Sequence, residues 1–114
     1  MSFFVTPFEV SARAFAEPVK CRFVHIFPGI ATRHSDTIDC VFRVNGRPVT
    51  VAIPCAPLNE LREREHKYLS DQQLAEIAGL HLRRVLEGAY DPRQAELLVG
   101  ETELRALASE LGYI

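Results

Sequence analysis

The segment from Pro28 to Asp36 contains the residues whose types and spacing are best suited to chemistry. The guanidinium of Arg33 can bind an anion, the imidazole of His34 can move a proton, and the carboxylate of Asp36 can orient His34 or the backbone amide of Ser35. Adjacent His, Ser and Asp residues do not easily converge into a hydrolase triad, because its members usually come from separated segments. We therefore predict a ligand-binding loop at Arg33, His34 and Asp36 with no catalytic residue. An ordinary turn-rich loop is the simpler alternative.

Spacing argues against a metal site or a disulfide among the cysteines. Cys21 and His25 lie four residues apart in one predicted strand, so their Cα atoms are about 13 Å apart and cannot share a zinc ion. Cys40 and Cys55 are also about 13 Å apart in the predicted hairpin, which is too far for a disulfide. We expect all three cysteines to be free and to pack as small hydrophobic side chains in a reducing compartment. His81, on the apolar stripe of a predicted helix, is expected to be a core histidine.

Length and composition describe a single globular domain over residues 1–114. The chain is 47% hydrophobic and 25% charged, which suits an ordinary apolar core. It has no Walker loop, G-x-G-x-x-G, H-E-x-x-H or EF-hand pattern, so we expect no metal and no cofactor. The longest uncharged stretch, Pro48 to Asn59, is too short to span a membrane, and no basic residue precedes the apolar N-terminal patch. We therefore expect a cytoplasmic protein with no membrane partner.

The formal charge differs between the two halves of the chain. Residues 1–56 carry six basic and four acidic side chains, whereas residues 57–114 carry seven basic and eleven acidic ones. An acidic surface repels the phosphate backbone of nucleic acids. We therefore do not expect nucleic acid as the main partner of this chain.

The N-terminal segment carries a helix start signal. Thr6 can cap the helix, and Pro7 suits its first position. The Glu9 carboxylate can accept a hydrogen bond from the backbone amide of Thr6. Apolar and polar residues also alternate from Phe8 to Ala14, which fits a strand. We predict a short helix over residues 7–16 and keep the strand as the alternative.

Residues 19–53 predict a three-stranded antiparallel meander. In the first strand, Val19 to Phe27, alternation divides the side chains between a face with Cys21, Phe23, His25 and Phe27 and a face with Lys20, Arg22, Val24 and Ile26. The Asn45-Gly46 pair then predicts a type I′ turn that joins strands 38–44 and 47–53. This turn places Val44 opposite Arg47, Phe42 opposite Val49, Cys40 opposite Val51 and Ile38 opposite Ile53. Pro48 indicates that the last strand is an edge.

Helical patterns dominate after Pro54. A short charged helix is predicted from Leu58 to Lys67, and a last helix from Glu101 to Leu111. Between them, Ser70 and Gln73 form a capping box for a longer helix that ends at Gly88. The expected fold class is α+β, with the C-terminal helices packed on one face of the meander.

The segment from Leu74 to Leu80, followed by Val85, resembles the helix-turn-helix signature of bacterial repressors. The resemblance implies a turn near Gly79 and a recognition helix over residues 82–87, from which Arg83 and Arg84 would contact DNA. One continuous helix over residues 70–88 accounts for the same apolar stripe, and both interpretations stay open here.

No set of acid, base and nucleophile converges in the sequence. We therefore expect a small accessory or protein-binding domain without catalytic activity. Apolar residues on both faces of the first strand, together with the open edges of the sheet, suggest a homodimer. The alternatives are a DNA-binding regulator that acts through residues 70–88, and a small ligand-binding protein or enzyme that uses the 28–36 loop.

Overall fold

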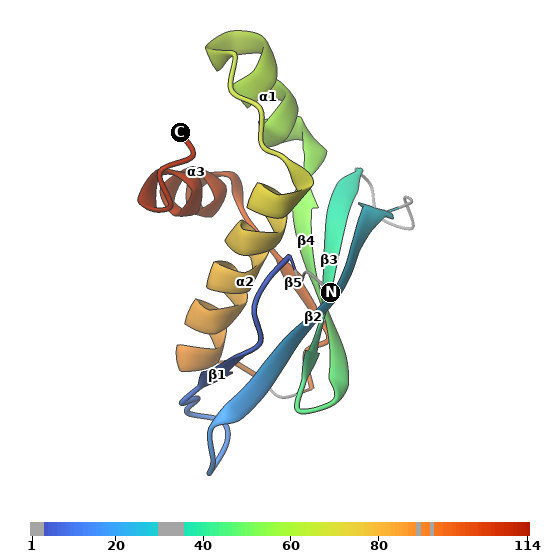
Figure 1. Ribbon diagram of the computed structural model, residues 1–114, viewed down its shortest axis with the longest axis vertical. Coiled ribbons are helices and arrows are strands. Elements are labelled where there is room, and N and C mark those ends of the chain that lie inside the picture. The colour runs from blue at the N-terminus through green and yellow to red at the C-terminus, as the bar shows by residue number, and fades with distance from the viewer. Residues whose placement is uncertain (1–3, 30–35, 89, 92) are drawn as a thin grey trace.

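The computed structural model describes residues 4–29, 36–88, 90, 91 and 93–114, which form one five-stranded sheet and three helices (Figure 1). The α+β class is therefore confirmed. The elements in chain order are β1 (Phe8–Val10), β2 (Val19–Gly29), β3 (Thr37–Val44), β4 (Arg47–Pro54), α1 (Cys55–Glu65), α2 (Asp71–Glu87), β5 (Glu96–Leu98) and α3 (Glu101–Glu110).

The sheet extends the predicted meander by one strand at each edge. The strand order is β1-β2-β3-β4-β5, in which β1 to β4 are antiparallel and β5 runs parallel to β4. The predicted N-terminal helix is wrong, because Phe8–Val10 pairs with Val19–Cys21 and this tertiary pairing overrides a local helix signal. The strand at Glu96–Leu98 was not predicted, since three residues are too few to show a period.

The β3–β4 hairpin has the predicted register. Asn45 and Gly46 both have positive φ, 52° and 82°, as a type I′ turn requires. β4 is not an edge strand, because β5 pairs with Thr50–Ala52. Pro48 lies outside that paired stretch, opposite Arg43. The missing N–H of the proline therefore interrupts no described strand pairing.

A β-bulge in β2 changes the predicted faces of this strand. The pairing register shifts between Phe23, which lies opposite Phe42, and His25, which lies opposite Val41. A bulge inserts one extra residue and so reverses the alternation beyond it. His25 and Phe27 consequently share the face of Val41 and Asp39, although the sequence pattern places them with Cys21 and Phe23. Ile26, opposite Cys40, turns to the core instead.

Helices α2 and α3 follow the signals predicted from the sequence, whereas α1 differs from its predicted bounds. α2 begins with the complete capping box of Ser70 and Gln73, and its cap is Gly88. α3 ends at Glu110, with Leu111 as its C-cap residue and Gly112 following at a φ of 80°. α1 starts earlier than predicted, at Cys55, directly after β4. It ends at Glu65, and the C-cap residue His66 has the left-handed backbone conformation.

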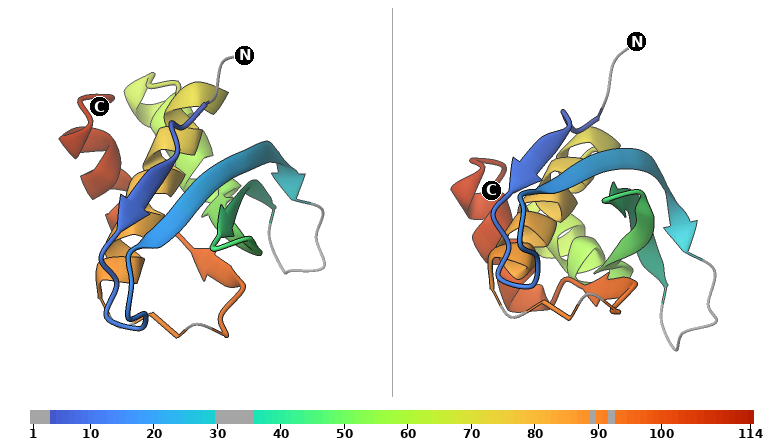
Figure 2. Two further views of the ribbon diagram at one scale, coloured as in Figure 1. Left: turned by 60° about the horizontal axis from the view of Figure 1, so that its bottom comes forward. Right: turned by 90° about the horizontal axis from the view of Figure 1, so that it is seen from below.

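α2 lies across one face of the sheet with α3 beside it, whereas α1 extends beyond the end of β4 (Figure 1 and Figure 2). The apolar core fills the space between the sheet and these two helices. Phe42 of β3 lies at its centre with no exposed surface. Gly79 of α2 allows a close approach, because a Cβ atom there would lie 3.3 Å from Val5 and 3.7 Å from the Phe42 ring. Among the described residues, no helix lies on the opposite face of the sheet.

α2 is one continuous helix from Asp71 to Glu87, so the turn that a helix-turn-helix needs near Gly79 is not formed. The two arginines of the DNA-binding alternative also have partners inside the molecule. The guanidinium of Arg83 lies 4.9 Å from the centre of the Phe8 ring, and Arg84 forms an ion pair with Glu110 of α3. The helix-turn-helix interpretation is therefore corrected.

Candidate functional site

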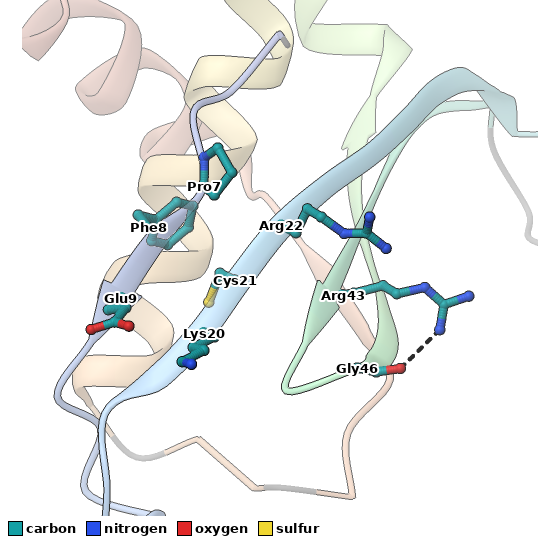
Figure 3. A pocket seen from close by; sticks show the side chains of 8 residues that line it. All are labelled: Pro7, Phe8, Glu9, Lys20, Cys21, Arg22, Arg43 and Gly46. Carbon is teal, nitrogen blue, oxygen red and sulfur yellow. Dashed lines mark hydrogen bonds between the residues drawn. The ribbon is translucent and has the colours of Figure 1, made fainter.

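A pocket of about 510 Å³ opens between the β1–β2 pair and the turn of the β3–β4 hairpin (Figure 3). β1 and the residue before it supply one wall, β2 supplies the floor, and the hairpin supplies the opposite wall. Its lining residues are Pro7, Phe8, Glu9, Lys20, Cys21, Arg22, Arg43 and Gly46.

Strand register concentrates positive charge in this pocket. Lys20 and Arg22 are two residues apart in β2 and therefore share a face. Arg22 lies directly opposite Arg43 of β3, and Lys20 lies opposite Glu9 of β1. Glu9 thus offers a counter-charge to Lys20, whereas the two arginines face each other across the strands. In Figure 3 their side chains extend in the same direction.

The hairpin turn holds one of these guanidinium groups in place. Nη1 of Arg43 donates a hydrogen bond of 2.8 Å to the carbonyl oxygen of Gly46. The type I′ turn presents that carbonyl, so the local sequence Arg-Val-Asn-Gly positions the arginine. Within the described ranges, no carboxylate forms an ion pair with Arg22 or Arg43.

Two neighbouring guanidinium groups without a carboxylate partner suit an oxyanion. Like charges directly opposite each other in a sheet are destabilising, by up to about 1 kcal/mol. A carboxylate or phosphate group placed between them would accept charge-assisted hydrogen bonds from both and would remove that repulsion. The arrangement is therefore chemically suited to an anionic group.

The thiol in the pocket is unsuited to nucleophilic chemistry. Burial raises the pKa of Cys21 to about 11, although the positive charge of Arg83 opposes this shift. The thiol is therefore protonated at neutral pH, whereas the thiolate is the reactive form. Burial likewise raises the pKa of Cys40 to about 12, with Asp39 adding to the shift. The described cysteines are all free. Cys21 and Cys40 are buried as predicted, whereas Cys55 is only partly buried.

The described residues of the predicted ligand-binding loop do not line this pocket. Arg33 and His34 lie outside the described residues. Asp36 precedes β3, where its backbone carbonyl accepts a 3.0 Å hydrogen bond from the amide of Cys55 and its side chain is exposed.

His81 lies on α2 as predicted and is only partly buried. Burial lowers its pKa, and the Glu103 carboxylate partly opposes that shift.

Sequence reasoning missed the arginine pair and a second polar pair on the same face of the sheet, opposite the helices. Thr37 and Asp39 are both buried at the start of β3, where the Thr37 hydroxyl donates a 2.7 Å hydrogen bond to the Asp39 carboxylate. The signal for Arg43 was available in its place two residues before the Asn45-Gly46 turn. Its pairing with Arg22 depends on the β2–β3 register, which the sequence alone does not reveal.

Within the part of the chain that the structure describes, no three His, Cys, Asp or Glu side chains gather in a way that could hold a metal ion. None of the described helices has the length and apolar character needed to cross a membrane.

Comparisons with protein-family models, with curated proteins and with solved structures found no match to this chain.

Proposed function

We propose that this chain is a small, non-catalytic binding module that holds an oxyanion, such as a phosphate or carboxylate group, in the pocket between β1–β2 and the hairpin turn. The observation that carries the proposal is the pairing of Arg22 with Arg43 at the pocket. Both side chains are exposed to an incoming ligand, and the Gly46 carbonyl fixes one of them in advance. Preorganised donors lose less entropy when a ligand binds.

The apolar part of the lining indicates that the anion belongs to a larger molecule. Pro7 and Phe8 belong to the β1 wall of the pocket, across β2 from the two arginine side chains (Figure 3). Arg83 stacks on the Phe8 ring and so supports it from the helix side. A free inorganic ion would leave this wall unused. An anionic group attached to a protein or small-molecule partner would contact both parts of the pocket, which agrees with the accessory or protein-binding role that we expect from the sequence.

Isothermal titration calorimetry with phosphate, pyrophosphate and acetate at low ionic strength tests the proposal. We expect pyrophosphate and phosphate to bind more tightly than acetate, because they offer more charged oxygens to two guanidinium groups. Arg22→Gln and Arg43→Gln should each weaken binding about tenfold, since a hydrogen bond to a charged group contributes roughly 1.5–3 kcal/mol.

Arg64→Gln is the matched control, because Arg64 is an exposed arginine of α1 outside the pocket lining. Its affinity for pyrophosphate should equal that of the unmodified protein. No binding heat with any of the three anions, or an equal loss of affinity in Arg64→Gln, would refute the site.

A further inference from the structure

The β-bulge in β2 places two aromatic side chains on the face of the sheet that carries the arginine pair. Arg22 lies opposite Arg43 on this face, which none of the described helices covers (Figure 2 and Figure 3). The bulge follows Phe23, so His25 and Phe27 turn to the same face instead of the core. Bulges that re-aim side chains in this way are common beside functional sites.

The two aromatic rings form a surface that is open to a ligand. Their centres are 5.0 Å apart, and both side chains are exposed, Phe27 by 41%. Val24, the extra residue of the bulge, is 40% exposed and lies between these rings and Arg22 along β2. We refer to Val24, His25 and Phe27 as the ring platform. An exposed aromatic ring of this kind can stack on a planar group of a ligand.

Strand register sets the spacing between the arginine pair and the ring platform. Arg43 and Val41 are two residues apart in β3, so their Cα atoms are about 7 Å apart, and His25 lies opposite Val41. Phe27 lies opposite Asp39, one further step of about 7 Å along β3. A ligand that contacts both features must therefore carry a spacer between its anionic group and its planar group.

The charges on the two central strands favour a phosphate group. The exposed charged side chains of β2 and β3 are Lys20, Arg22 and Arg43, which are all basic. Asp39, the one carboxylate in these two strands, is only 7% exposed and accepts a hydrogen bond within β3. The acidic excess of residues 57–114 lies on the helices, on β5 and on their connections, and so does not extend across β2 and β3.

We propose that the ligand of this face is a free nucleoside phosphate, which binds with its phosphate on the arginine pair and its base on the ring platform. The inference rests on the anion-binding function proposed above and names the small molecule that carries the anion. A phosphate group accepts charge-assisted hydrogen bonds from both guanidinium groups. The sugar that joins phosphate and base is the spacer that the strand register requires, and the base stacks on the exposed rings.

Other phosphorylated groups match this arrangement less well. In phosphotyrosine the phosphate is bonded directly to the ring, so the ring stays beside the arginine pair and does not reach Phe27. A single-stranded nucleic acid repeats its phosphates and bases, whereas this face, within the described residues, offers one arginine pair and one ring platform. The net formal charge of −2 also opposes a long polyanion.

Isothermal titration calorimetry with adenosine monophosphate and ribose 5-phosphate at low ionic strength tests the assignment. The two molecules share the sugar and the phosphate, and only the first carries a base. Adenosine monophosphate should therefore bind about tenfold more tightly, which is the gain expected from stacking one base. Phe27→Ala should remove this advantage and leave the affinity for ribose 5-phosphate unchanged.

Tyr68→Ala is the matched control, because Tyr68 is an aromatic residue with 72% exposure between α1 and α2, outside the sheet. Its affinity for both molecules should equal that of the unmodified protein. Phe27→Tyr keeps an aromatic ring and should retain the preference for adenosine monophosphate. If circular dichroism shows that Phe27→Ala is unfolded, His25→Ala and the comparison of the two molecules on the unmodified protein decide.

Equal affinities for adenosine monophosphate and ribose 5-phosphate would overturn the nucleoside phosphate. Pyrophosphate binding that still depends on Arg22 and Arg43 would then leave the anion-binding site itself intact, so the two proposals can fail separately. A loss of ribose 5-phosphate affinity in Phe27→Ala as large as the loss for adenosine monophosphate would contradict stacking on Phe27. A short single-stranded oligouridylate that binds about a hundredfold more tightly than adenosine monophosphate would assign the site to a nucleic-acid strand instead.

Discussion

Burial decides which side chains of this protein are chemically available. Cys21 and Cys40 lie on the core face of the sheet, and desolvation holds their pKa values near 11 and 12. Arg22 and Arg43 lie on the opposite face and keep their donors exposed. Within a few positions of β2 and β3, one face therefore carries unreactive thiols and the other carries accessible guanidinium groups.

Thiol modification should distinguish the three cysteines. Cys55 is partly exposed at the start of α1, although burial and the nearby Asp36 and Asp39 carboxylates raise its pKa too. We expect a thiol reagent at neutral pH to label Cys55 in the folded protein, and to reach Cys21 and Cys40 only after unfolding. Mass spectrometry of the native and urea-unfolded protein measures this difference. Rapid native labelling of Cys55→Ser would contradict it.

His81 should make the folded state less stable in mild acid. Burial lowers its pKa below the ordinary value, so the unfolded chain binds the proton more readily than the folded one. The contribution of neutral His81 is therefore complete above about pH 6.5 and is lost as the pH falls from there through the lowered pKa.

Urea unfolding at about pH 7.5 and about pH 5 measures that change in the free energy of unfolding. His81→Gln cannot take up this proton, so its free energy of unfolding should change less between the two conditions. An equal change in both proteins would assign the pH dependence to other groups. Glu65 and Asp91 also have lowered pKa values, because they pair with Arg105 and Arg93, but they lose their stabilising charge in a more acidic range.

At the scale of single elements, the sequence best predicts those whose backbone hydrogen-bonding groups are satisfied by residues nearby in the chain. The I′ turn closes β3 and β4, and the capping box starts α2. The amide of Ser70 donates to the side-chain carbonyl of Gln73, whose own amide donates to the Ser70 hydroxyl. Such short-range bonds form whatever surrounds them, which is why both elements could be predicted from the sequence.

Ser70→Ala should lower the free energy of unfolding by about 1 kcal/mol, because the amide of Gln73 loses the hydroxyl that accepts its hydrogen bond. Ser109→Ala is the control, since Ser109 is exposed within α3 and alanine is favourable there. Thermal or urea unfolding of both variants measures the effect. A loss in Ser109→Ala as large as that in Ser70→Ala would show that the cap is not its cause.

At the scale of the whole molecule, one core joins the sheet to the helices. Phe42 packs edge-on against Phe23, with ring centres 5.5 Å apart, and lies beneath Gly79 of α2. Polar contacts on the outside then fasten α3. Arg84 pairs with Glu110, Arg105 pairs with Glu65 at 2.8 Å, and the Tyr113 hydroxyl donates to a carboxylate of α2. These outer ion pairs are exposed and contribute little by themselves.

Phe42→Ala should cost about 3–5 kcal/mol, because it leaves a cavity where the sheet meets α2. For a domain with a total stability of roughly 5–15 kcal/mol, such a loss brings the chain close to unfolding. Tyr68→Ala should change stability by less than about 0.5 kcal/mol, because its side chain is mostly exposed. Chemical unfolding of the two variants checks the contrast, and similar losses in both would contradict the placement of Phe42 at the centre of the core.

The sequence by itself determined the elements whose signals are local: the hairpin with its register, α2 with its caps, the end of α3 and the burial of Cys21 and Cys40. Only the tertiary structure decided the rest. Long-range pairing turned the N-terminal segment into β1 and three residues into β5, and packing kept α2 continuous through Gly79. The bulge in β2 set the faces of His25 and Phe27, and the β2–β3 register placed Arg22 opposite Arg43. Strand registers and bulges depend on pairing with residues far along the chain, so a local sequence pattern does not reveal them.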